Sequence, residues 1–220
     1  MTAQRLNARF RNGQASNDLS LAGVILHSFD NTEESSKPFL PCSPPTWCSI
    51  YGDRMSTTLV NKRLTHLYGN NEDVSGLVLA PRPAQLLCSY GMDGGTMTKL
   101  CNPPGISRTC VPGCWEGTPN WCTLDSVYDC AWRPENVSVM LRLQMGAPYT
   151  YNELVLGTES WLRDPVSAIE AIFYMRGSPF QESKARGVHA GLVQDHRDAR
   201  ERVPVLTMDL SNADEPFAVP

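Results

Sequence analysis

The chain has 220 residues, of which 41% are hydrophobic and 19% are charged, and its formal net charge is -4. These values are typical of a folded globular domain, and they exclude a disordered chain and a strongly basic nucleic-acid-binding protein. No apolar run approaches the roughly 18 residues that are needed to cross a bilayer, so we expect no transmembrane segment.

The first third of the chain predicts a helix or loop followed by short strands. The apolar run Ala22–Phe29 is typical of a strand. Four prolines between Thr32 and Trp47 exclude regular structure there. The leucines within 53–68 follow helical spacings, which predicts a helix that begins near Ser56. The run Ser75–Pro81 predicts a second strand, stopped by proline.

Residues 82–132 predict a loop-dominated insertion, because glycine and proline turns fill the segment and no hydrophobic period is maintained. A segment without an apolar face cannot stabilise itself by burial. Each disulfide, by contrast, contributes about 2–4 kcal/mol by restricting the unfolded chain. We therefore expect cross-links to replace a core in this segment.

Eight cysteines, an even number, lie in the middle of the chain, and this pattern favours disulfides. They are Cys42, Cys48, Cys88, Cys101, Cys110, Cys114, Cys122 and Cys130. Zinc is the alternative, since Cys110 and Cys114 are close in sequence. The paired C-x-x-C spacing is missing, however, and no histidine lies in the cluster, so we expect no metal.

Disulfides place the protein in an oxidising compartment, either secreted or in an organelle lumen. The single glycosylation sequon, at Asn136, is compatible with secretion. The first residues lack the apolar segment of a secretory signal, so we expect that a targeting segment has been removed.

The chain becomes regular again after residue 132. A helix that begins with Pro134 is expected to bury one face, formed by Val137, Met140, Leu141 and Gln144. The remaining expected elements are strands at Tyr151–Gly157, Ile169–Met175 and Val203–Leu210, a break at Pro165 and an amphipathic helix at Glu182–Arg202. This order predicts a single α+β domain over 1–220, with a mixed or antiparallel sheet and the disulfide-rich insertion.

Three short motifs follow one another in an order known from an enzyme family. The first contains Arg9, the second, Arg54–Thr58, contains Ser56, and the third, Tyr151–Leu156, contains Glu153. In this order they resemble the arginine strand, the Ser-Thr segment and the glutamate strand of the ADP-ribosyltransferase fold, in particular its enterotoxin-like members.

The resemblance implies that Arg9 holds the pyrophosphate of NAD as substrate, that Ser56 supports the glutamate and the ribose, and that Glu153 contacts the nicotinamide ribose. Cleavage of an N-glycosidic bond develops oxocarbenium character, which a carboxylate stabilises. Tyr151 departs from the pattern, because arginine-modifying members carry Glu or Gln there. Strand alternation alone gives the alternative, in which Glu153 and Glu170 face solvent and Arg9 is a surface cation.

The strands that follow Tyr151 and Ile169, together with the cysteine-rich turns, also resemble uncharacterised cysteine-rich proteins of marine algae. That resemblance implies a photosynthetic organelle, with the thylakoid lumen as a candidate compartment.

The leading hypothesis is a non-catalytic extracytoplasmic subunit, without a cofactor, that docks with other protein subunits in a larger assembly. Trp115, Trp121 and Trp132 lie on or beside the insertion, and tryptophan is enriched at interface hot spots, so we expect these residues to bind the partner. Packing over the disulfides is their alternative role. An NAD-consuming mono-ADP-ribosyltransferase or NAD glycohydrolase is the second hypothesis. A secreted carbohydrate-binding module that uses the same tryptophans is the third.

Overall fold

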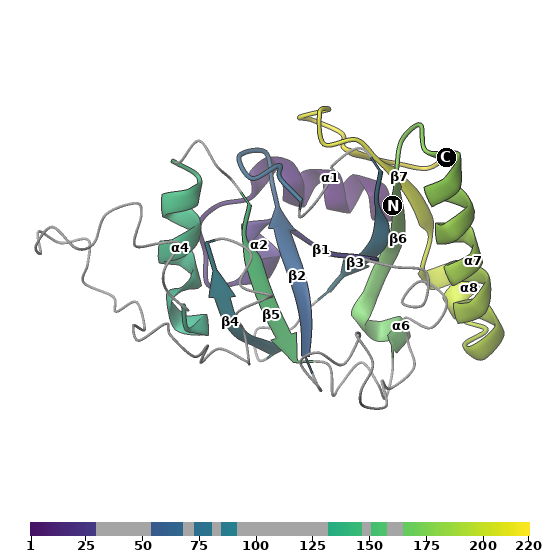
Figure 1. Cartoon of the computed structure of the whole chain (residues 1–220), viewed down its shortest axis with the longest axis horizontal. Coiled ribbons are helices and arrows are strands. Elements are labelled where there is room, and N and C mark those ends of the chain that lie inside the picture. The colour runs from purple at the N-terminus through teal and green to yellow at the C-terminus, as the bar shows by residue number, and fades with distance from the viewer. Residues whose placement is uncertain (30–53, 68–72, 81–84, 92–131, 147–150, 158–164) are drawn as a thin grey trace, which may run out of the picture.

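The computed structural model describes residues 1–29, 54–67, 73–80, 85–91, 132–146, 151–157 and 165–220. These residues form an eight-stranded sheet with helices packed on it, in the strand order β4-β5-β2-β1-β3-β6-β7-β8 (Figure 1). Neighbouring strands are antiparallel except β6 and β7, which are parallel. The predicted α+β class with a mixed sheet is confirmed.

The bounds of the elements are as follows. The strands are β1 Val24–Ser28, β2 Arg54–Val60, β3 Ser75–Leu79, β4 Leu86–Tyr90, β5 Glu153–Gly157, β6 Ile169–Met175, β7 Val205–Met208 and β8 Phe217–Ala218. The helices are α1 Thr2–Asn12, α2 Leu19–Ala22, η4 Pro134–Asn136, α4 Val137–Gln144, α6 Pro165–Ala168, α7 Pro179–Asp195 and α8 Ala199–Arg202.

The sheet is buried on both faces. Successive strand residues point to opposite sides, and each side has its own core cluster. On β1, Val24 and Leu26 pack with Leu6 and Phe10 of α1 in one core cluster. Ile25, between them, belongs to the other cluster, which includes the apolar residues of α4 and α7. The strands therefore lie between α1 on one face and α4 with α7 on the other.

The helix predicted from near Ser56 is wrong, because this segment is the central strand β2. Its residues alternate, with Leu59 in one core cluster and Val60 in the other. β1 and β5 both hydrogen-bond to β2, so each of its edges is paired. The leucine spacing fitted a helix, but the β-branched residues of the segment and its two-sided burial favour a strand.

Periodicity predicted α4 correctly. The four residues expected on its apolar face are the buried ones. The helix predicted at Glu182–Arg202 is displaced toward the N-terminus. Helix α7 begins at Pro179, where the Ser178 side chain caps it by accepting from the Gln181 N–H, and it ends at Asp195. His196 is extended, and the chain then forms the separate helix α8.

Part of the expected insertion, 82–132, belongs to the sheet. Strand β4 lies inside these bounds and pairs with β5. Ser89 of β4 and Trp132 exchange two backbone hydrogen bonds, of 2.9 and 2.8 Å. Residues 92–131, with most of the expected cross-links, lie outside the described residues.

The two ends of the chain meet at the edge of the sheet. The Asn7 side chain of α1 donates to the Phe217 carbonyl and accepts from the Phe217 N–H, at 2.9 Å in both cases. No pattern in the sequence predicted β8, which has two residues and depends on contacts with β7 and α1. Among the helices of the described ranges, none has the length and apolar character that a membrane span requires.

Candidate functional site

Two of the three residues proposed from the sequence come into contact. β2 and β5 are neighbours, with Ser56 opposite Val155 and Thr57 opposite Leu154. Ser56 and Glu153 therefore project from the same face of the sheet. The Ser56 hydroxyl donates a hydrogen bond to Glu153 Oε1 at 2.5 Å.

The Glu153 carboxylate lies inside the protein, with an exposed fraction of 0%. In the register of the sheet, Tyr90 of β4 stands directly opposite Glu153. Tyr90 also forms a small buried cluster with Cys88 and Val155. A buried carboxylate is costly unless it is hydrogen-bonded, and Ser56 supplies one such bond. The alternative interpretation, in which Glu153 faces solvent, is wrong.

Asn152 fixes the start of β5, although the sequence did not single it out. Its side chain accepts from the Leu59 N–H at 2.9 Å and donates to the Leu59 carbonyl at 2.8 Å. The amide therefore forms the two bonds that a facing strand residue would form to β2. Because Asn152 is bonded at both atoms and fully buried, it holds the adjacent Glu153 against β2, within reach of the Ser56 hydroxyl.

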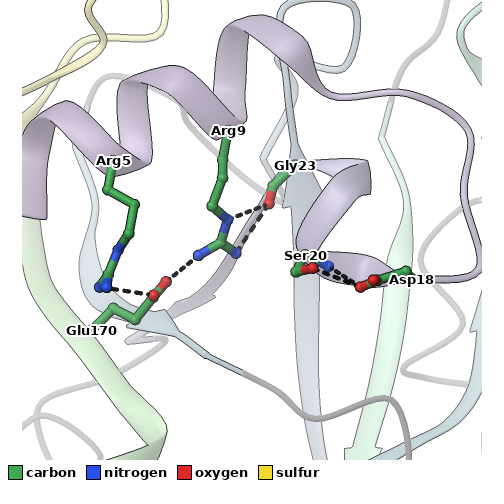
Figure 2. Close-up of polar contacts among 6 residues, drawn as sticks. All are labelled: Arg5, Arg9, Asp18, Ser20, Gly23 and Glu170. Atoms are coloured by element: carbon green, nitrogen blue, oxygen red, sulfur yellow. Dashed lines mark hydrogen bonds and ion pairs between the residues drawn. The ribbon is translucent and has the colours of Figure 1, made fainter.

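Arg9 lies on helix α1, in the segment where a helix or loop was expected, and not on the opening strand that the resemblance implied. Its Nε and Nη2 atoms donate to the Gly23 carbonyl at 3.2 and 3.1 Å (Figure 2). Its Nη1 atom pairs with Glu170 of β6. Within the part of the chain that the structure describes, the hydrogen bonds of Arg9 go to these two residues and not to the Ser56–Glu153 pair.

Glu170 sits between two arginines. Arg5 Nη2 lies 3.0 Å from one carboxylate oxygen, while Arg9 binds the other. The side chains of Arg9 and Glu170 are 16% and 11% exposed, whereas that of Arg5 is 59% exposed. Arg9 and Glu170 therefore form a largely buried ion pair that ties α1 to β6. Neither residue is the solvent-facing group of the alternative interpretation.

Gly23, whose carbonyl accepts from Arg9, lies where the chain has no room for a side chain. A Cβ atom there would lie 2.4 Å from the Val60 carbonyl oxygen. Nearby, Asp18 caps α2 by accepting from the Ser20 N–H at 2.9 Å and from its hydroxyl at 2.7 Å (Figure 2). These bonds, led by that of the hydroxyl, hold the pKa of Asp18 below its ordinary value.

His27 is a further buried polar residue close to the pair. His27 lies near the end of β1, and its Nδ1 atom is 2.8 Å from the backbone oxygen of Ser56 on β2. Its ring meets the Phe29 ring edge-on, with centroids 6.4 Å apart, and Lys184 of α7 lies over that ring. A lone histidine in a strand carries no signal for such a contact, so sequence reasoning missed it.

The expected partner-binding tryptophans are only partly described. Trp132 is 2% exposed and packs in the main core cluster, so the expectation that it forms a contact surface is wrong. Trp115 and Trp121 lie outside the described residues. Asn136 is also buried, at the start of α4, and is therefore no surface acceptor for a glycan.

Cys88 is the one cysteine among the described residues, and it is not a free thiol. The other seven cysteines lie outside those residues, so the pairing of the eight stays a prediction. Across the described ranges, no group of three or more histidine, cysteine or acidic side chains is arranged to hold a metal ion.

The fold and the site define the class of the protein: an α+β domain with a mixed eight-stranded sheet and a buried serine–glutamate pair between β2 and β5. No protein-family model matches the chain, and a search of curated proteins gives no match either.

Proposed function

We propose that the protein is a non-catalytic docking domain, one subunit of a larger assembly in an oxidising compartment outside the cytoplasm. One observation carries this proposal: the side chains with catalytic potential are bonded to other residues of the fold. Glu153 is fully buried against Ser56, and Arg9 is bound by Glu170 and Gly23. A catalytic carboxylate must come within hydrogen-bond reach of its substrate, and this one is enclosed by protein.

The segment that carries Trp115 and Trp121 has a firm base, which supports a role in docking. It leaves the sheet after Gly91 and returns at Trp132. The paired backbone hydrogen bonds between Ser89 and Trp132 hold these two ends side by side. Fixed ends reduce the conformational entropy that a loop loses when it binds a partner, which favours affinity.

The compartment is proposed from the cysteines. Cys88 is buried on β4 and is not a free thiol, which is consistent with oxidising conditions. Secreted proteins and the lumens of organelles, including a photosynthetic organelle, meet that condition.

Purification of the native protein from its source tests the proposal. We expect it to elute in a complex, and we expect the Trp115→Ala/Trp121→Ala double variant to lose the partner. Phe180→Ala is the matched control, because it removes an aromatic side chain that is exposed on α7. A native protein that always elutes as a free monomer contradicts the proposal.

The Ser56–Glu153 contact favours a second candidate, an NAD-consuming ADP-ribosyltransferase or NAD glycohydrolase. The resemblance requires these two residues to meet, and they are hydrogen-bonded. Turnover of radiolabelled NAD by the wild-type protein and by Glu153→Gln tests this function. Equal turnover by the two proteins rejects it, while a loss confined to the variant favours it over the docking role.

A further inference from the structure

Three buried polar atoms lack a hydrogen-bond partner where β4 meets α4, within the part of the chain that the structure describes. They are Ser89 Oγ, Trp132 Nε1 and Gln144 Oε1. All three residues are buried almost completely. A buried polar group that stays unpaired costs about 1–3 kcal/mol, and native proteins pair the great majority of such groups.

Ser89 and Trp132 point to the same side of the sheet. Their backbones exchange two hydrogen bonds, so they are directly opposite each other, and opposite residues of an antiparallel pair project from one face. On that face Trp132 belongs to the same core cluster as Val137, Met140 and Leu141 of α4. The serine hydroxyl and the indole N–H therefore both lie between β4 and α4.

Gln144 brings the third atom to the contact between α4 and the end of β4. It lies on the buried face of α4, and its Nε2 atom donates to the Gly91 carbonyl at 2.7 Å and also to the Tyr151 carbonyl. Gly91 is two residues beyond Ser89. Because both N–H bonds of the amide are used, the orientation of the amide is fixed and Oε1 is left as an acceptor.

The three atoms have complementary capacities. An indole N–H only donates, an amide oxygen only accepts, and a hydroxyl does either. A cation is disfavoured by the N–H donor, and an anion is disfavoured by the amide oxygen. A water molecule fits both, because it accepts from Trp132, donates to Gln144 and forms its third bond with Ser89. Buried waters typically make about three hydrogen bonds.

We propose that this place between β4 and α4 is a binding site for one internal water molecule. The water joins Trp132, at the return of the 92–131 segment, to the strand and the helix that carry the segment. It completes the hydrogen bonding at the base of that segment, independently of which partner the segment binds.

Water–protein cross-relaxation in a ¹⁵N-labelled sample tests this site. The indole N–H of Trp132 is assigned from the peak that disappears in Trp132→Phe. We expect a rotating-frame cross-peak between this proton and water, with the sign of through-space contact, and a nuclear Overhauser effect with the sign of a long-lived water.

The variant Ser89→Ala removes one of the three bonds and adds no bulk, so we expect its cross-peak to weaken severalfold. Ser20→Ala, which alters an exposed serine on α2, serves as the control and should leave the peak unchanged. The proposal is overturned if the wild-type indole proton shows no water cross-peak. It is also overturned if the cross-peak has the sign of chemical exchange, because the site is then open to solvent.

Discussion

Two glutamates stand at the beginning of strands that run in the same direction, and their surroundings differ completely. Glu153 opens β5, is fully buried and is hydrogen-bonded by a neutral serine. Glu170, near the start of β6, is partly exposed and lies between Arg5 and Arg9. Similar positions in two parallel-running strands thus hold a carboxylate in different ways, because α1 brings cations to one of them and β2 brings a hydroxyl to the other.

The largest effect is expected at the ion pair of Glu170. Arg9→Ala removes the buried partner of this carboxylate and leaves the Gly23 carbonyl without the donor it had. Breaking a buried pair costs about 3–5 kcal/mol, so we expect a loss of this size in the free energy of unfolding, measured by urea denaturation.

Arg5→Ala is the matched control for Arg9, since it removes the exposed member of the same cluster. Exposed ion pairs contribute about 0–1 kcal/mol. Equal losses for Arg5→Ala and Arg9→Ala would show that burial does not distinguish the two arginines.

The next largest effect concerns the anchor of Glu153. Asn152→Ala removes both hydrogen bonds to the Leu59 backbone. The N–H and the carbonyl of Leu59 are then left unpaired inside the sheet. We expect the free energy of unfolding to fall by about 2–3 kcal/mol. Asn152→Asp removes only one of the two bonds: it keeps an acceptor for the Leu59 N–H but loses the donor to the Leu59 carbonyl. A variant Asn152→Ala as stable as wild type would contradict the anchoring role.

A smaller loss of stability is expected when the hydrogen bond between Ser56 and Glu153 is removed. Ser56→Ala removes the hydroxyl that bonds Glu153, which should lower the free energy of unfolding by about 1–2 kcal/mol. Combining Ser56→Ala with Glu153→Gln in a double-mutant cycle measures the coupling of the two side chains. Strictly additive losses would mean that the contact stabilises nothing.

The smallest effect is a change in titration at Asp18, close to Arg9. Since hydrogen bonds from Ser20 lower its pKa, Asp18 contributes stability above the pKa of the unfolded chain, and that contribution is lost as pH falls through the folded pKa. Ser20→Ala should raise the pKa of Asp18 toward its ordinary value, as measured by NMR titration. Asp209, whose pKa Ser211 chiefly lowers, should titrate as before and is the control.

The sequence predicted correctly those elements that their own residues are sufficient to specify. In α4 the buried residues recur at the helical spacing, and in β6 an apolar run forms a strand that is buried at every residue except Glu170. β2 was predicted as a helix because its assignment depends on β1 and β5, which pair with it across long separations in sequence.

The contact between Ser56 and Glu153 followed from the resemblance, whereas the place of Arg9 did not. An arginine on an amphipathic helix and one on a strand look alike in a short motif, and only the fold brings Glu170 to it. The roles of Asn7 and Asn152 depend on partners 210 and 93 residues away, so no local pattern could reveal them.

The hydrogen bonds of Asn7 satisfy backbone groups at one edge of the sheet. A terminal strand with free amide and carbonyl groups is a template for another chain, and natural sheets protect such strands. Here the outermost strand has only two residues, and the amide of Asn7 already occupies both the N–H and the carbonyl of Phe217. One asparagine on the first helix thus takes up the backbone groups through which Phe217 could otherwise pair with a strand of another molecule.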